Sequence, residues 1–410
     1  SGAASDVKEP LRLEGRPLLS SEDVARYFGV PHGRMIWTLY RAPDTVRYRH
    51  FEIPKRSGGM RPIHAPTGLV RELQDKLLVD LTALYRPHPH AHGFIGGRSV
   101  TTNAAFHTGR RWVLNIDLED FFPTINFGRV RGLFLKAPFE MGPAAAAVCA
   151  QIATYRNGLP QGAPTSPVIS NLIAATLDRR LLRLARQHKV EYSRYADDIT
   201  FSTAQHTFPP SIALREPIDG GGYAITAGEG LALAIAQSGF SINMRKVRLQ
   251  GHGVHQSVTG LTVNARVNVA RERIRRLRAM LHAWRKFGLD AAAAEHFAKY
   301  RGADPAARAH APARAFRNVV YGHLAFVGMV RGKDDPVFLK LCAKVLEADP
   351  DPSRFIRQMV FGADDYEVFI SHASEDKETI ARPIWAACAK AGIKAFLDDA
   401  HIGFGQSFAM

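Results

Sequence analysis

The chain has 410 residues, 46% of them hydrophobic, which is enough for two or three domains that each bury a core. Its 54 lysines and arginines exceed its 38 aspartates and glutamates, and the net charge of +16 favours a polyanionic partner. Three widely separated cysteines, Cys149, Cys342 and Cys388, exclude a disulfide framework. Because the sequence shows no 18-residue apolar run and no signal-peptide pattern, we expect a cytoplasmic protein without a membrane partner.

The first elements are expected to be packing elements. Residues 1–47 form a predicted helical extension in which Ser20 to Gly29 has the pattern of a capped helix with a glycine stop. Two β-like runs, 48–53 and 60–64, then flank a basic turn, which is typical of a surface hairpin and could also cover phosphates. Apolar positions at helical spacing predict an amphipathic helix over 69–85.

Two groups of polar residues follow this helix. His88, His90 and His92 alternate along an extended segment, an arrangement that could hold a metal, but no carboxylate or cysteine lies nearby in sequence, so structural or RNA-facing roles are favoured. Asn103 and His107 are spaced to share one helical face, which by itself indicates a cap or a buried polar pair.

Three carboxylates end two apolar β-like runs. Asp117 ends the run 112–116, and Asp197 and Asp198 stand side by side in the run 195–202. Adjacent carboxylates within such a run favour a hairpin tip, where both can reach one cation; a solvated polar turn is the alternative. Three carboxylates are the minimum ligand set for two Mg²⁺ ions about 3.5–4 Å apart, the arrangement used in phosphoryl transfer.

Residues Ile116 to Phe122 and Tyr195-Ala196-Asp197-Asp198 together resemble the palm of a reverse transcriptase. Phe51 to Arg61 resembles the fingers element of that family, and Gly158 to Pro167 its Pro-Gln-Gly element, all in the family's order. The resemblance implies an α+β right-hand polymerase, with fingers and palm in 48–264 and a helical thumb in 265–350, that copies RNA into DNA from dNTPs.

The same resemblance implies roles for single residues. Asp117, Asp197 and Asp198 would be catalytic and would hold two Mg²⁺ ions. Phe122 would lie beneath the 2′ position of the nucleotide, although a core phenylalanine is the alternative, and Lys246 is either an active-site or a surface lysine. The full set implied to contact the nucleotide is Lys55, Arg61, Leu118, Phe122, Gln161 and Lys246.

Two short elements resemble those of retron reverse transcriptases, namely Asn103-Ala104-Ala105-Phe106-His107 and Val258-Thr259-Gly260. The resemblance implies that the protein copies its own structured non-coding RNA and holds the branched RNA–DNA product. Group II intron-like and abortive-infection reverse transcriptases remain alternatives. The residues implied to bind RNA in these two elements are Asn103, His107, Val258, Thr259 and Gly260.

The segments between and after the acidic motifs are expected to be mainly helical. Helices are predicted over 143–154 and 167–186, and another over 227–238 after an inserted loop, 204–222, for which we predict no function.

An arginine-rich helix over 268–286 suits a thumb that packs on one side and follows a sugar-phosphate backbone on the other, through Arg271, Arg275 and Arg278. Further thumb residues, 321–328, and a helix over 336–346 follow it.

The last segment, 364–410, has eight acids and four bases, so residues 1–363 carry about +20. After a linker, 351–363, its pattern of strand, helix and strand resembles the first βαβ unit of a flavodoxin-like TIR domain. The unit is incomplete, since it stops before the helix that carries the glutamate of NAD⁺-cleaving members. NAD⁺ would be a substrate only of a completed TIR domain.

Two functions from different classes follow. The first is the RNA-directed DNA polymerase of a retron, in an anti-phage system whose TIR effector degrades NAD⁺; its partners would be its cognate RNA and DNA, and a second copy bound through the TIR domain or the RNA–DNA. The second is a nucleic-acid-binding scaffold that restrains a TIR NADase. Three carboxylates are unfavourable to hold close together, so their presence favours the polymerase over the scaffold.

Overall fold

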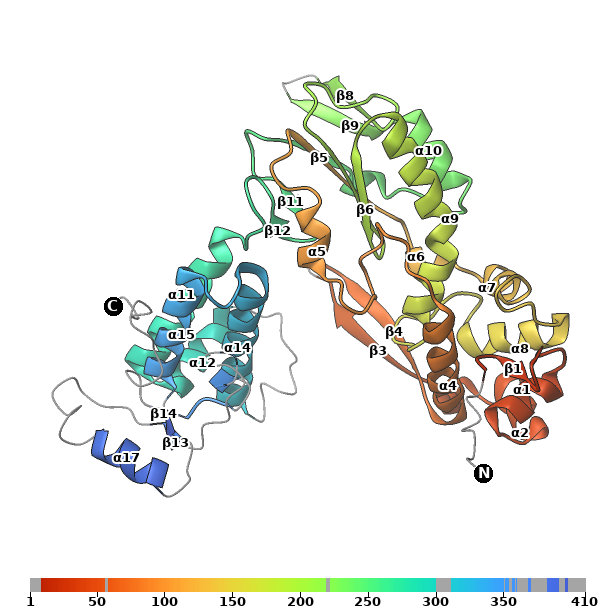
Figure 1. Ribbon diagram of the computed structural model, residues 1–410, viewed down its shortest axis with the longest axis horizontal. Helices are drawn as coiled ribbons and strands as arrows, with labels where there is room; N and C mark the ends of the chain where they lie inside the picture. Colours follow the sequence, from red (N-terminus) through yellow and green to blue (C-terminus); the bar gives the residue numbers. More distant parts are fainter. Residues whose placement is uncertain are drawn as a thin grey trace. The chain divides into compact units, whose positions relative to one another are not determined.

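The computed structural model describes residues 9–55, 58–218, 222–299 and 311–349, together with shorter stretches at 351–353, 356–357, 359, 368–369, 382–390 and 395–396. The chain divides after Val267 into two compact units, and each is described by itself (Figure 1). Among the described residues, no helix is long and apolar enough to cross a membrane.

The first unit begins with small elements around a capped helix. Ser20 accepts the N–H of Asp23 while Asp23 accepts the N–H of Ser20, and Gly29 ends the helix at φ 67°, so the predicted cap and glycine stop are confirmed. The elements are β1 (Arg12–Leu13), β2 (Arg16–Pro17), α1 (Ser21–Phe28), α2 (His32–Tyr40) and α3 (Asp44–Arg47).

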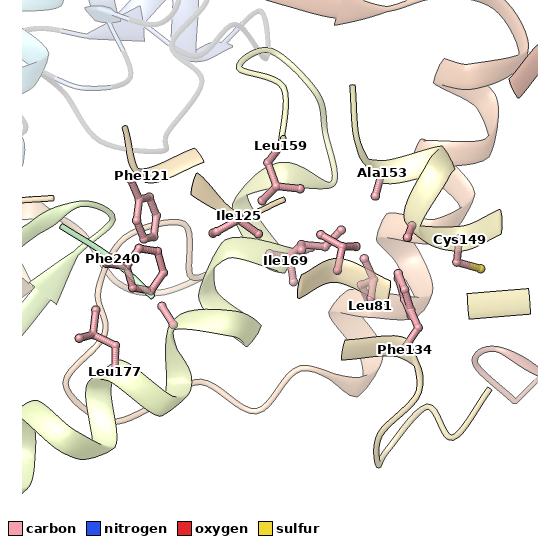
Figure 2. Close-up of a cluster of buried hydrophobic side chains, with 14 of the residues drawn as sticks. Leu81, Phe121, Ile125, Phe134, Cys149, Ala153, Leu159, Ile169, Leu177 and Phe240 are labelled. Carbon is pink, nitrogen blue, oxygen red and sulfur yellow. The ribbon is translucent and has the colours of Figure 1, made fainter. Parts of the chain in front are cut away.

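A long hairpin and a helix follow. Strands β3 (Tyr48–Pro54) and β4 (Met60–Pro66) pair antiparallel over their whole length, and α4 (Gly68–Leu84) buries the leucines at its predicted helical spacing. Figure 2 shows Leu81 of this helix in one buried cluster with Phe134, Cys149 and Ile169 from three other helices. These helices are α7 (Phe127–Phe134), α8 (Pro143–Ala153) and α9 (Ser166–Gln187).

The centre of the first unit is a four-stranded antiparallel sheet with the order β10-β5-β7-β6, here called the central sheet. Helix α9 packs against β6, its outermost strand. The strands are β5 (Trp112–Asp117), β6 (Glu191–Tyr195), β7 (Asp198–Thr203) and β10 (Arg248–Gly251), and the short helices α5 (Val100–Ala105) and α6 (Phe121–Thr124) adjoin them in sequence.

The prediction of a plain loop over 204–222 is wrong, because this segment contains half of a hairpin. Strand β8 (Ala213–Pro217) pairs with β9 (Tyr223–Ala227), and Arg215 lies 3.5 Å from the centre of the Tyr223 ring. Strand β9 also takes the first residue of the predicted helix, so α10 spans only Glu229–Ala236. The remaining elements are the 3₁₀ turn Met244–Lys246, β11 (Ser257–Val258) and β12 (Leu261–Thr262).

The described residues of the second unit include a bundle of four helices, α11 (Arg271–Phe287), α12 (Leu289–Lys299), α14 (Pro312–Arg331) and α15 (Pro336–Ala348). Trp284 of α11 packs against Phe316 and Tyr321 of α14. Helix α12 was not predicted, because its alanine run lacks a marked apolar stripe.

Beyond the bundle, β13 (Val368–Phe369) pairs in parallel with β14 (Ala395–Phe396), and α17 (Arg382–Lys390) lies between them in sequence. This order agrees with the predicted strand, helix and strand. Most of the linker and most of the segment 364–410 lie outside the described residues.

Candidate active site

The central sheet brings the three predicted carboxylates to one end of two strands. Asp117 at the end of β5 is the direct cross-strand partner of Asp198 at the start of β7. Tyr195 pairs with Asp198 in the β6–β7 hairpin, so Ala196 and Asp197 form its two-residue turn, with Ala196 at φ 58°. The hairpin-tip interpretation of the two adjacent aspartates is therefore confirmed.

Backbone hydrogen bonds hold this end of the sheet in place. The N–H of Leu118 donates to the carbonyl of Asp197 at 3.1 Å, and the N–H of Asn243 donates to the carbonyl of Asp117 at 2.9 Å. Leu118 is buried and its N–H is already used. The structure thus gives Leu118 a role in fixing the turn of Ala196 and Asp197, instead of the expected contact with the nucleotide.

The electrostatics of the site are those of crowded carboxylates. Burial, followed by the neighbouring Asp197 and Asp117 charges, raises the pKa of Asp198 to about 7, although one side of Asp198 stays open to solvent. The pKa of Asp197 is also raised, by burial and then by Asp117. The Nζ of Lys246 donates to Oδ1 of Asp117 at 2.8 Å, which places Lys246 in the site.

The carboxylates of Asp117, Asp197 and Asp198 are the type of ligand that a divalent cation prefers, because hard oxygens that repel one another gain most from a bound positive charge. Among the described residues, however, no three carboxylate, imidazole or thiolate groups are close enough together to hold one metal ion. Lys246 provides positive charge at Asp117 in this arrangement.

A cavity of about 130 Å³ lies directly beside Asp117 and Asp198. The β11–β12 turn reaches this cavity with Thr259 and Gly260, while Lys246 and Arg248 add positive charge to its wall. The remaining lining residues are Asn115, Ile116, Ile199 and Ser257. The second retron-like element therefore borders the carboxylates.

Three other residues were predicted to contact the nucleotide, namely Arg61, Gln161 and Lys55, and the structure places each of them differently. The positive charge of Arg61 on β4 favours the ionised form of Asp197, but burial and the charge of Asp117 outweigh it and the pKa of Asp197 is raised. The carbonyl of Gln161 accepts the N–H of His64 at 2.8 Å, which ties the Pro-Gln-Gly loop to the same strand. Lys55 is exposed at the turn of the hairpin, and no described contact joins it to the carboxylates.

Phe122 is half-buried in a group of three aromatic rings. Its ring centre lies 5.5 Å from that of Phe121 and 6.0 Å from that of Phe94. Phe94 is 46% exposed and has φ 62°. No role in the site was predicted for Phe94, which directly follows Gly93 in a glycine-rich stretch.

The structure corrects three of the predicted RNA contacts, because Asn103, His107 and Val258 are fully buried. Both ring nitrogens of His107 are hydrogen-bonded at 2.7 Å, to the hydroxyls of Ser202 and Ser193. Helix α5 ends at Ala105, so His107 lies beyond the helix that was expected to carry it.

The two retron-like elements also meet. Helix α5 packs on β11 and β12, and the Thr259 hydroxyl lies 3.4 Å from the Val100 carbonyl. The side-chain amide of Asn103 has no hydrogen-bond partner among the described residues. Of these elements, Ala105, Phe106 and Gly260 are exposed and Thr259 is partly exposed.

The histidine stretch is structural. Nδ1 of His90 shares a hydrogen bond with the Tyr192 carbonyl at 2.8 Å, and Nδ1 of His92 shares one with the Thr102 hydroxyl at 2.9 Å. The carbonyls and N–H groups of this segment also bond to β6, since the N–H of His92 donates to the carbonyl of Arg194.

Within the second unit, α11 has the predicted two-sided character. Leu277, Leu281 and Trp284 are buried. Arg271, Arg275 and Arg278 are exposed on its opposite side, and their contact with a phosphate backbone stays a prediction.

Comparisons with known proteins agree with this geometry. Residues 53–259 match the family model described as reverse transcriptase (RNA-dependent DNA polymerase). Among curated proteins, the chain is similar to the retron Mx65 reverse transcriptase of Myxococcus xanthus, with 40% identity over 64% of this chain and 62% of that protein. The retron Mx162 reverse transcriptase of the same organism is 34% identical, over 64% of this chain and 58% of that protein. The retron Ec86 reverse transcriptase of Escherichia coli is 32% identical, over 66% of this chain and 80% of that protein.

The chain thus spans about three fifths of the first two relatives. Solved structures with some likeness include telomerase from Candida albicans in complex with a fragment of telomeric RNA, at 9% identity and a TM-score of 0.38, over 76% of this chain and 65% of that one.

Proposed function

Because the chain belongs to the reverse transcriptase family, we propose that it is the RNA-directed DNA polymerase of a retron, which copies its own structured RNA into a branched RNA–DNA product. The observation that carries the proposal is the pairing of Asp117 with Asp198 across β5 and β7, with Asp197 in the adjoining turn. The retron relatives, at 32% to 40% identity, favour a retron over another bacterial reverse transcriptase.

In the proposed reaction, a primer hydroxyl attacks the α-phosphate of a dNTP and pyrophosphate leaves. Asp117, Asp197 and Asp198 would move closer together than they are with Lys246 on Asp117 and would then hold divalent cations, which when bound neutralise the phosphates and stabilise the attacking and leaving oxygens. Arg61, from the hairpin beside the turn, would bind the triphosphate. Phe122 would pack against the sugar.

Lys246 has a second role in this proposal. Its ammonium group offsets the repulsion between Asp117 and Asp198 when cations are absent, which keeps the carboxylates from spreading apart. Because Lys246 is half-exposed, its side chain can turn away when a cation arrives.

The metal-binding role is tested with Asp197→Asn and Asp198→Asn, since each removes a charged ligand. Primer extension with Mg²⁺ should fall by about a hundredfold or more, while gel-shift affinity for RNA stays near that of the wild type because the basic surface provides it. Asp75→Asn, an exposed aspartate on α4, is the matched control. Wild-type extension by either site variant would exclude the assignment.

The branched product separates the retron from the alternatives. RNA that copurifies with the protein should carry DNA joined through a 2′,5′ linkage, which a debranching enzyme releases. Linear cDNA alone would indicate a different bacterial reverse transcriptase. Copurifying RNA without any DNA would favour the scaffold function.

The C-terminal segment is the basis of a second proposal, that a completed TIR domain is the NAD⁺-degrading effector of an anti-phage system. The parallel pairing of β13 with β14 around α17 is the observation that supports it, because parallel strands with a connecting helix are the repeating unit of α/β sheets.

A further inference from the structure

A buried ion pair lies directly behind the turn of Ala196 and Asp197 that joins β6 and β7, here called the catalytic turn because of the role proposed for Asp197. Arg194 on β6 and Asp178 on α9 are both fully buried. Nε and Nη2 of the guanidinium donate to the two oxygens of Asp178 at 2.7 Å and 2.8 Å, and the Tyr192 hydroxyl donates to the same carboxylate at 2.6 Å. Asp178 therefore accepts at least three hydrogen bonds and fully orients the guanidinium.

The remaining nitrogen of this guanidinium reaches the turn itself. Nη1 of Arg194 donates to the carbonyl of Ala196 at 2.9 Å and to Oδ1 of Asn171 at 3.2 Å. Ala196, at φ 58°, has a left-handed backbone that is unfavourable for a residue with a Cβ. A hydrogen bond from a fixed guanidinium to its carbonyl holds this conformation.

Asn171 secures the opposite side of the turn. Its Nδ2 donates to the carbonyl of Gly93 at 2.9 Å, and Gly93 lies so close to the turn that a Cβ there would be 2.4 Å from the backbone nitrogen of Ala196. One network of α9 side chains thus holds both the turn and the segment that presses on it.

We propose that Arg194, oriented by Asp178 and assisted by Asn171, is a positioning residue that fixes Ala196 so that Asp197 and Asp198 face Asp117. The inference rests on the polymerase function proposed above. Stability alone is a poor explanation for the ion pair, because well-packed apolar residues in place of a buried salt bridge are often neutral or stabilising. The contact with the catalytic turn supplies the reason to keep it.

The test removes the buried polar group as a unit, with the full-length variant Asp178→Leu/Tyr192→Phe/Arg194→Met. We expect a melting temperature and RNA affinity close to those of the wild type. The kcat of primer extension should fall at least tenfold, and the Mg²⁺ concentration for half-maximal rate should rise. Arg71→Gln/Asp75→Asn, an exposed ion pair on α4, is the control and should leave kcat and the Mg²⁺ dependence unchanged.

Rescue distinguishes positioning from a general structural role. Glycine adopts the left-handed region without penalty, so Ala196→Gly added to the triple variant should restore kcat at least threefold. Arg194→Lys is the second variant, because it retains a charge for Asp178 but cannot also reach Ala196; it should show the same loss of kcat.

The outcomes separate this inference from the function on which it rests. If the wild type extends primers and the folded variants keep wild-type kcat and Mg²⁺ dependence, the positioning role is overturned while the polymerase function stands. Unfolding of both the triple variant and Arg194→Lys would also overturn it, in favour of a purely structural ion pair. Absence of extension by the wild type with its own RNA would refute the proposed function itself.

Discussion

The single residues of the site show which side chains a sequence pattern can identify. Asp117, Asp197 and Asp198 were predictable because each ends or interrupts an apolar run, and a carboxylate there needs a partner. Arg194 and Asp178 were not predictable, because they lie sixteen positions apart on two different elements and no local pattern marks a buried ion pair. His107 was assigned to RNA, but its two serine partners come from strands that only the fold brings together.

The ring of Phe122 leads to a prediction about sugar selection. Phe122→Ala should open space where a 2′-hydroxyl would lie, and we expect discrimination between dNTPs and rNTPs to fall about 10- to 100-fold. Competing single-nucleotide incorporation measures this ratio. Phe287→Ala, which truncates a 58% exposed phenylalanine of the second unit, is the control. Unchanged discrimination in an active Phe122→Ala enzyme would place the sugar filter at another residue, with Phe94 as the next candidate.

His107 also carries a pH dependence. Burial, and then the charge of Arg110, lowers its pKa to about 3, whereas an unfolded histidine titrates near 6.5. Above pH 6.5 neither state binds a proton at this site. As the pH falls below 6.5 only the unfolded chain does, so the free energy of unfolding should decrease by about 1.4 kcal/mol per pH unit.

The comparison with His107→Gln isolates this contribution. Between pH 6.5 and 5 the wild type should lose about 2 kcal/mol more than the variant, in urea unfolding of the first unit. His252→Gln, at an exposed position, should behave as the wild type does. Equal pH slopes for the wild type and His107→Gln would show that His107 binds a proton in the folded protein.

At the scale of elements, the sequence was most informative where a periodic pattern was long. Helices α4, α8 and α9 begin and end within about two residues of their predicted limits, because their apolar spacing is long and a proline or glycine marks each start. The β8–β9 hairpin was missed because paired prolines and three consecutive glycines mark turns, and its strands of five residues are too short to show alternation between them.

The packing of the elements also explains why the two retron-like sequences indicate where the site lies. Helix α5 and the β11–β12 turn pack on one another, and His107 after α5 joins β6 to β7, the strands that carry the catalytic turn. A sequence element that is buried behind a site can identify a subfamily as well as one that contacts the substrate. Thr259 and Gly260 line the cavity beside Asp117.

For the whole molecule, the distribution of charge constrains where nucleic acid can lie. Residues 1–363 carry about +20, and the segment from Asp364 onward is acidic, so an RNA–DNA product is attracted to the first part and repelled by the second. We therefore expect bound nucleic acid to lie along the basic helix α11, away from the C-terminal segment.

This separation permits control of the proposed effector by the polymerase product. We predict that RNA–DNA binds more tightly to the arrangement in which the TIR segments are inactive, so its destruction shifts the population toward NAD⁺ cleavage. The measurement is NAD⁺ consumption by the full-length protein purified with its RNA–DNA, before and after nuclease digestion. The Asp197→Asn/Asp198→Asn variant, which should bind RNA but make no DNA, shows whether RNA alone suffices for restraint. If digestion leaves NAD⁺ consumption unchanged under conditions in which the TIR domain is competent, the two functions are tethered without being coupled, because a ligand with equal affinity for both arrangements shifts neither.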